Sequence, residues 1–191
     1  MPNLYLIGYR GCGKTTVARL LGERLQMPVV DADEYLEQQA GMTIREIFAA
    51  EGEAGFRQRE ADIAQALTKQ DSLIVSWGGG VILRETNRDA LQRAGKIVWL
   101  RARPETLLER IERDPTTGAR RPNLTAAGGL PEIQNLLTVR EPIYAAVADR
   151  IVDADDVSPQ SLAAGIAEWF ERSPARSKGN AAGTRREEGN L

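Results

Sequence analysis

Histidine is absent from the 191 residues, so no imidazole can act as a general base or bind a metal ion. A general base must therefore be a carboxylate, a lysine, a tyrosine or a water molecule. Any metal site must depend on oxygen ligands, which favours magnesium over zinc.

The sequence contains a single cysteine, Cys12. One cysteine cannot form an intramolecular disulfide or a cysteine-rich zinc site. The net charge of −2 argues against a general nucleic-acid-binding protein, which usually has a basic excess. The apolar run in MPNLYLIGYRGCGK is too short for a secretory signal or a membrane span. We therefore expect a cytoplasmic protein with no nucleic-acid or membrane partner. No additional apolar stripe stands out, so we expect a monomer.

Short apolar runs alternate with helical patterns along most of the chain. The strand runs are continuously apolar, which is typical of a parallel sheet covered by helices on both faces. We expect one domain over 1–172 and a disordered tail over 173–191, because the tail has nothing to bury. Strands are expected at 4–7, 29–30, 72–76, 96–100 and 150–152. Helices are expected at 34–40, 43–51, 55–69, 85–93, 104–113 and 131–148. Two more helices are expected to begin at residues 14 and 159.

Residues 8–15, GYRGCGKT, fit the phosphate-loop pattern G-x-x-x-x-G-K-[ST]. Glycines let successive backbone N–H groups point inward as an anion nest, and the following helix adds its positive end. Lys14 would reach the β- and γ-phosphates of a nucleotide, and the Thr15 hydroxyl would bind Mg²⁺. The match follows an apolar strand and opens an amphipathic helix, so we interpret it as a nucleotide site.

Cys12 lies inside this loop and leaves two alternatives open. The first is a thiol with a lowered pKa, since a helix N-terminus favours the thiolate, and a thiol reagent would then inactivate the protein. The second is a small side chain that points away from the phosphates.

Three further groups of residues have the chemistry of an acceptor site. Asp31 and Asp33 follow the second strand; one could hold Mg²⁺ through water and the other accept a proton, or they could be ordinary turn and capping acids. Arg57 and Glu60 can pair on a helix, and a fixed arginine suits a planar carboxylate, although a surface ion pair has the same spacing. Gly78, Gly79 and Gly80 end the third strand, where ligands of α/β sheets bind, or they form a flexible turn.

Taken together, these segments resemble those of shikimate kinases. The motifs in chain order are GYRGCGKTT, DAD, GEAGFRQRE, SWGGG, RRPNL and VREPIY, and the resemblance covers about residues 3–170. It implies a three-layer α/β/α P-loop NTPase fold, similar to nucleoside monophosphate kinases, with a five-stranded parallel sheet of order 2-3-1-4-5. It also implies transfer of the γ-phosphate of ATP to the 3-hydroxyl of shikimate, with Mg²⁺ as cofactor.

The resemblance implies a role for each matching residue. Asp33, Lys14 and Arg121 would be catalytic, and Mg²⁺ would be held by Thr15 and, through water, by Asp31. The ATP-binding residues would be Gly11, Cys12, Gly13, Lys14, Thr15, Thr16, Arg110 and Arg121. The substrate-binding residues would be Asp33, Arg57, Gly78, Gly79, Gly80 and Arg140, and a substrate-binding region is expected at about 33–60.

The segment DPTTGARRPNL departs from the family pattern because it is longer than the usual lid, which we place at about 112–125. Arg121 is preferred over Arg120 as the lid arginine since it directly precedes Pro122, and either Arg110 or Arg113 would lie against adenine. Two alternative functions remain: a gluconate kinase-like enzyme for small acids, and a catalytically silent family member that binds ligands or proteins.

Overall fold

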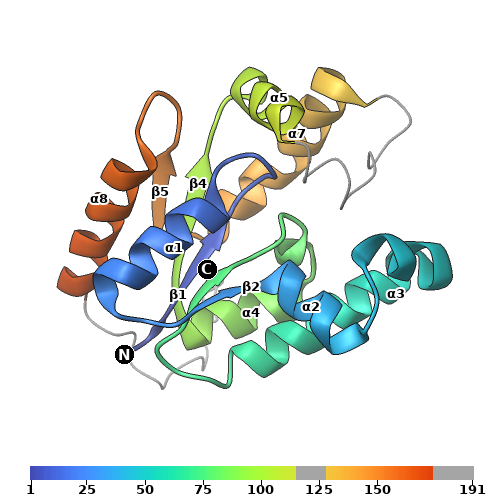
Figure 1. Ribbon diagram of the computed structural model, residues 1–191, viewed down its shortest axis with the longest axis horizontal. Coiled ribbons are helices and arrows are strands. Elements are labelled where there is room, and N and C mark those ends of the chain that lie inside the picture. The colour runs from blue at the N-terminus through green and yellow to red at the C-terminus, as the bar shows by residue number, and fades with distance from the viewer. Residues whose placement is uncertain (115–127, 174–191) are drawn as a thin grey trace, which may run out of the picture.

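The computed structural model describes residues 1–114 and 128–173 and contains one five-stranded parallel sheet (Figure 1). The strand order is β2-β3-β1-β4-β5, which confirms the expected order 2-3-1-4-5. The strands are β1 (Asn3–Ile7), β2 (Val29–Asp31), β3 (Ile74–Ser76), β4 (Gly95–Arg101) and β5 (Arg150–Asp153). The helices are α1 (Lys14–Leu25), α2 (Ala32–Ala40), α3 (Ile44–Leu67), the 3₁₀ helix η1 (Val81–Leu83), α4 (Glu85–Ala94), α5 (Pro104–Arg113), α7 (Gly129–Val147) and α8 (Pro159–Arg172).

Helices cover both faces of the sheet, as the continuously apolar strands predict. In β1, Leu4 and Leu6 enter one hydrophobic core, whereas Tyr5 and Ile7 enter the other, and all four side chains are fully buried. Helices α1 and α8 pack together over the first core, and α3 and α4 pack over the second (Figure 1). The result is the expected three-layer arrangement.

Local sequence signals explain several helix boundaries, and many of the predicted boundaries differ from the structure by one or two residues. Helix α2 begins two residues before the expected Glu34, because Asp31 accepts hydrogen bonds from the N–H groups at its start. Strand β3 begins at Ile74 rather than 72, because Ser72 has a φ of 62°, which is incompatible with a strand. Helix α7 begins at Gly129 rather than 131. The two helices expected at 43–51 and 55–69 form α3, with a backbone break at Gly52.

The parallel strands bring three turns together at one edge of the sheet. Strands β2, β3 and β1 are adjacent, so the segments that follow their carboxyl ends meet at that edge.

Of the expected lid, only 112–114 belongs to the described residues, and 174–191 of the expected tail lie outside them. Within the described ranges, no helix combines the length and apolar character needed to cross a bilayer.

Candidate active site

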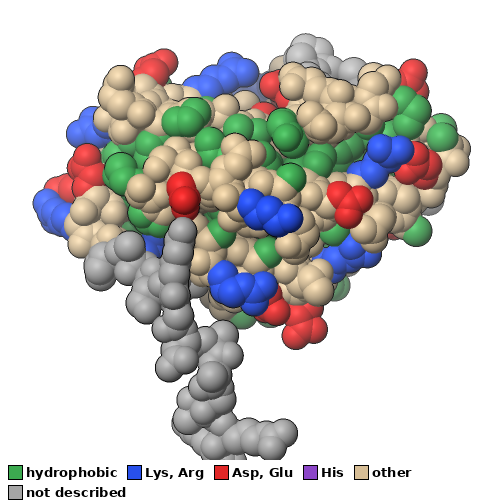
Figure 2. All heavy atoms as spheres, turned by 90° about the horizontal axis from the view of Figure 1, so that it is seen from below, with side chains coloured by type: hydrophobic (Ala, Val, Ile, Leu, Met, Phe, Trp, Pro, Cys, Tyr) green, Lys and Arg blue, Asp and Glu red, His purple; other side chains and the backbone are tan. Residues whose placement is uncertain are grey.

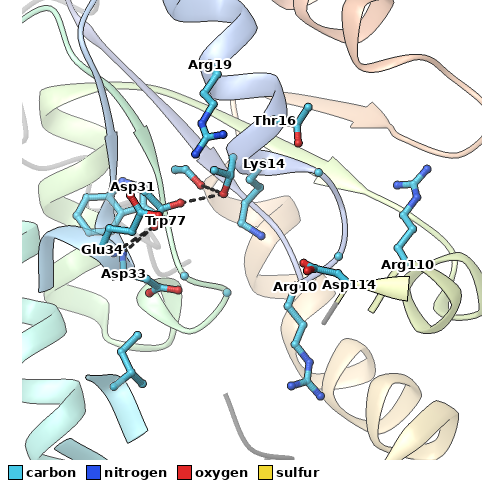
Figure 3. Close-up of a pocket in the computed structure, with 17 residues that line it drawn as sticks. Arg10, Lys14, Thr16, Arg19, Asp31, Asp33, Glu34, Trp77, Arg110 and Asp114 are labelled. Atoms are coloured by element: carbon cyan, nitrogen blue, oxygen red, sulfur yellow. Dashed lines mark hydrogen bonds between the residues drawn. The ribbon is translucent and has the colours of Figure 1, made fainter. Parts of the chain in front are cut away.

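A cleft of about 600 Å³ opens where these turns meet (Figure 3). It collects residues from the phosphate loop, from the ends of β2 and β3 and from the end of α5. Figure 3 shows Asp31 and Asp33 on one side of Lys14 and Arg110 on the other. Of the predicted site residues, the cleft is lined by Gly11, Gly13, Lys14, Thr15, Thr16, Asp31, Asp33, Gly78, Gly79 and Arg110.

The phosphate loop has the backbone shape that its glycines predict. Gly11 and Gly13 have φ values of 83° and 91°, in the left-handed region that other residues rarely adopt. Helix α1 starts directly after Gly13, so its unpaired N–H groups and its positive end face the cleft. Lys14 Nζ donates to the carbonyls of Gly8 and Tyr9, both at 2.9 Å. The loop can therefore bind a polyphosphate.

Cys12 contributes its backbone to this loop, whereas its side chain belongs to the protein core. The side chain is 1 % exposed and packs in the cluster that contains Leu4 and Leu6. Its Sγ lies 3.6 Å from Lys14 Nζ. This placement fits the alternative of a small side chain directed away from the phosphates.

Three oxygen-bearing side chains gather beside the loop and could hold a magnesium ion. Thr15 Oγ1 donates to Asp31 Oδ2 at 2.8 Å, and Thr15 Oγ1 lies 3.4 Å from Ser76 Oγ. The other Asp31 oxygen caps α2 by accepting from the N–H groups of Asp33 and Glu34. Capping fixes the direction of the Asp31 carboxylate, so the hydroxyl and the carboxylate are held together by the fold.

The triple-glycine turn lies between the two arginines expected to bind a carboxylate. A Cβ at Gly80 would lie 2.7 Å from Arg57 Cζ, so the guanidinium packs directly on this glycine. A Cβ at Gly79 would lie 3.5 Å from Arg140 Nη1 and 3.1 Å from the Gly8 carbonyl oxygen. The turn therefore contacts both arginines and the phosphate loop, whereas Arg57, Gly80 and Arg140 are not among the residues that line the cleft.

Both arginines are held in place by neighbouring side chains. Arg57 Nη1 donates to Glu60 Oε2 at 2.9 Å, which confirms that this pair forms, and Nη2 bonds Glu53 at 3.3 Å. Glu60 and Arg140 are only 5 % and 7 % exposed. The Arg140 guanidinium lies 5.9 Å from the Tyr9 ring centroid, within reach of a cation–π interaction.

The structure also separates the two candidates for the adenine contact. Arg110 lines the cleft and donates to the carbonyl of Ala154 at 2.8 Å, whereas Arg113 pairs with Glu109 on the exposed side of α5. Arg110 is therefore the better placed. The expected lid arginine, Arg121, lies outside the described residues, as does Arg120.

Sequence reasoning missed an ion pair at the cleft. Arg10 lines the cleft and donates to Glu132 Oε1 at 3.1 Å, and the Glu132 side chain is fully buried at the start of α7. No local signal could have revealed it, since the partners are 122 residues apart. Tyr144 ends the motif VREPIY, but the motif alone did not indicate that its hydroxyl donates to the carbonyl of Gly79.

Comparisons with known proteins agree with this geometry. The family model "Shikimate kinase" matches residues 10–171. A shikimate kinase of Rhodopirellula baltica is 46 % identical over 79 % of this chain and 81 % of its own. A shikimate kinase of Symbiobacterium thermophilum is 43 % identical over 88 % of this chain and 96 % of its own.

Solved structures give the same result. The shikimate kinase of Acinetobacter baumannii, in complex with shikimate, has a TM-score of 0.83 and 36 % identity over 90 % of this chain and 93 % of its own. A gluconokinase of Sinorhizobium meliloti has a TM-score of 0.55 at 18 % identity over 90 % of this chain and 98 % of its own, so it shares the fold alone. The family match and the identities over most of the chain place this protein in the shikimate kinase family.

Proposed function

We propose that this protein transfers the γ-phosphate of ATP to the 3-hydroxyl of shikimate, giving shikimate 3-phosphate and ADP. The observation that carries the proposal is the contact between the phosphate loop and a glycine turn flanked by Arg57 and Arg140. A triphosphate and a carboxylate can then be bound side by side, as a kinase with a small hydroxy acid as acceptor requires.

The donor side of the cleft is formed by the phosphate loop and α5. The N–H groups from Gly11 to Thr16 would bind the phosphates, and Lys14 would exchange loop carbonyls for phosphate oxygens, which are stronger acceptors. Arg110 would lie against the adenine ring, since the Ala154 carbonyl holds it at the cleft.

The acceptor side would be formed by the two arginines, the glycine turn and Asp33. Arg57 and Arg140 would bind the carboxylate of shikimate, because a guanidinium matches a planar carboxylate. Gly79 and its neighbours would contact the substrate through the backbone. The substrate hydroxyl would then face Asp33, which lines the same cleft.

In the proposed reaction, the 3-hydroxyl oxygen forms a bond to the γ-phosphorus while the bond to the departing ADP oxygen breaks. Asp33 orients the hydroxyl and accepts its proton. Lys14 stabilises the negative charge that develops on the transferring group. We assign the same function to Arg121, as a residue of the proposed lid that would also exclude water.

Mg²⁺ is the cofactor that these residues fit. Thr15 would bind it directly and Asp31 through water, because hydroxyl and carboxylate oxygens are the ligands magnesium prefers. Within the described residues, no three acidic or cysteine side chains converge on one point, which suits an ion held largely by phosphates and water. Mg²⁺ would neutralise charge on the β- and γ-phosphates.

The test is a coupled assay of ADP release with Mg·ATP alone, with added shikimate and with added gluconate. We expect release that depends on shikimate, with shikimate 3-phosphate identified by mass spectrometry. Release that depends on gluconate would favour the gluconate kinase alternative. Release without any acceptor dependence, or none, would favour the silent family member.

The proposal includes a cytoplasmic enzyme that works as a monomer. The described residues of the proposed site lie together within a single copy of the chain, which supports a monomer. Light scattering of the eluting protein in size-exclusion chromatography tests the oligomeric state, and a dimer whose dissociation abolishes turnover would contradict this part.

A further inference from the structure

We propose that the hydroxyl of Tyr144 is a positioning group that fixes the peptide between Gly79 and Gly80 and thereby prepares the turn for the acceptor substrate. The inference rests on the proposed function and deepens it, because it concerns what holds the backbone of the same site in one conformation. Tyr144 would act through the turn without touching the substrate.

The three carbonyl groups of the turn are held in two different ways. Gly78 O accepts from the N–H of Val81 at 3.2 Å, and Gly80 O accepts from the N–H of Leu83 at 3.0 Å. These two bonds belong to the turn and to η1. The middle carbonyl, that of Gly79, accepts instead from Tyr144 Oη at 2.6 Å, across 65 residues of sequence.

This middle bond has a specific consequence for the backbone. The peptide bond is planar and trans, so fixing the Gly79 carbonyl also fixes the direction of the Gly80 N–H, which points the opposite way. Glycine populates several backbone conformations at similar energy, so a flip of this peptide would cost little by itself. The Tyr144 hydroxyl removes that freedom at the point where the turn lines the cleft.

Tyr144 is itself held rigidly. Its side chain is fully buried, and its ring stacks on Trp99 of β4 with centroids 5.4 Å apart. It lies one helical turn after Arg140 on α7, so both side chains share a face of the helix. Helix α7 therefore places two side chains next to the same glycine turn. These are Arg140, the proposed carboxylate ligand, and Tyr144, whose hydroxyl holds the Gly79 carbonyl.

The hydroxyl also keeps its proton under all ordinary conditions. Burial raises the pKa of Tyr144 above its usual range, and the charge of Arg140 and a hydrogen bond with its side chain oppose this only in part. The neutral phenol remains a hydrogen-bond donor, as the contact with a carbonyl oxygen requires.

The test is Tyr144→Phe, which removes the hydroxyl and keeps the ring. We expect the KM for shikimate to rise about 3- to 10-fold, the effect of one lost hydrogen bond, while the KM for ATP changes less than about twofold. Amide signals of Gly79 and Gly80 in nitrogen-15 NMR should shift or broaden, since the peptide gains alternative orientations.

Tyr5→Phe is the matched control. The Tyr5 hydroxyl is also fully buried, and it accepts a hydrogen bond at 2.8 Å from Nδ2 of Asn3, the first residue of β1. Both variants lose a buried hydroxyl, so a purely structural role predicts a lower melting temperature for both and an unchanged shikimate KM. The positioning role predicts a change in shikimate KM that is confined to Tyr144→Phe and is accompanied by shifted or broadened amide signals of Gly79 and Gly80.

The outcomes separate this inference from the proposed function. If the wild-type protein fails to phosphorylate shikimate, the proposed function fails, and the glycine amide signals still test the hydroxyl. Unchanged amide signals in Tyr144→Phe overturn the inference. So does an active wild type for which Tyr144→Phe leaves the shikimate KM unchanged or raises both KM values equally.

Discussion

Gly80→Ala should displace Arg57 and weaken the binding of shikimate without harming the fold. Gly80 has φ and ψ of −97° and −9°, which alanine adopts without strain. The added Cβ would lie 2.7 Å from Arg57 Cζ and 2.8 Å from Nη2, which is closer than van der Waals contact allows. These atoms are the end of a flexible side chain, so the guanidinium moves and the backbone stays.

The magnitude follows from what Arg57 would lose. A hydrogen bond to a charged group contributes about 1.5–3 kcal/mol, and every 1.4 kcal/mol is a factor of ten in an equilibrium constant. If the displaced guanidinium loses one such bond to the shikimate carboxylate, kcat/KM for shikimate falls about 10- to 100-fold. The KM for ATP should remain near that of the wild type, because the phosphate loop is untouched.

Steady-state kinetics with each substrate varied in turn is the assay, and thermal unfolding verifies the fold. Gly165→Ala is the control, since this glycine lies inside α8 with nothing within 4 Å of an added Cβ. That control should keep full activity and gain roughly 0.5–1 kcal/mol of stability. A shikimate KM in Gly80→Ala equal to the wild type would refute the role of Arg57 as a carboxylate ligand.

Three further predictions address the chemistry. Asp33→Asn should abolish transfer while ATP still binds, because the amide cannot accept the proton; near-normal turnover with shikimate would remove Asp33 from the reaction. Arg121→Ala should lower kcat strongly with the melting temperature unchanged, and an unaltered kcat would reject the lid role. Cys12 should react with a thiol reagent only when the protein unfolds, as its side chain is 1 % exposed; rapid labelling of the native protein followed by mass spectrometry would show otherwise.

The fold could be predicted because its signals are local. The apolar run before Gly8, the glycines of the loop and the change to helical period at Lys14 all lie within a few residues of one another. The parallel sheet followed from continuously apolar strands, and its order came from the family resemblance. Errors occurred at boundaries, where one side-chain contact decides the outcome, as at Asp31, which starts α2 early by capping it.

Several residues that line the cleft could be named from motifs, but the contacts between them could not be predicted. Asp33, Gly79 and Arg110 were each named from motifs, and each lines the cleft. The contacts that hold such residues depend on how distant elements pack. The bond from Arg10 to Glu132 spans 122 residues, and neither residue stands in a pattern that indicates a partner.

The triple glycine explains why Arg57 and Tyr144, which are far apart in the sequence, contact the same turn. A glycine permits close approach, and at Gly80 the neighbour that approaches is the guanidinium of Arg57. The same lack of side chains leaves the turn free to change conformation, so a site built on it needs an external constraint. At Gly79 the Tyr144 hydroxyl supplies one. The three glycines in the sequence indicate a turn that can change conformation. The hydrogen bond from Tyr144 that restricts the turn can be recognised only once α7 is packed against it.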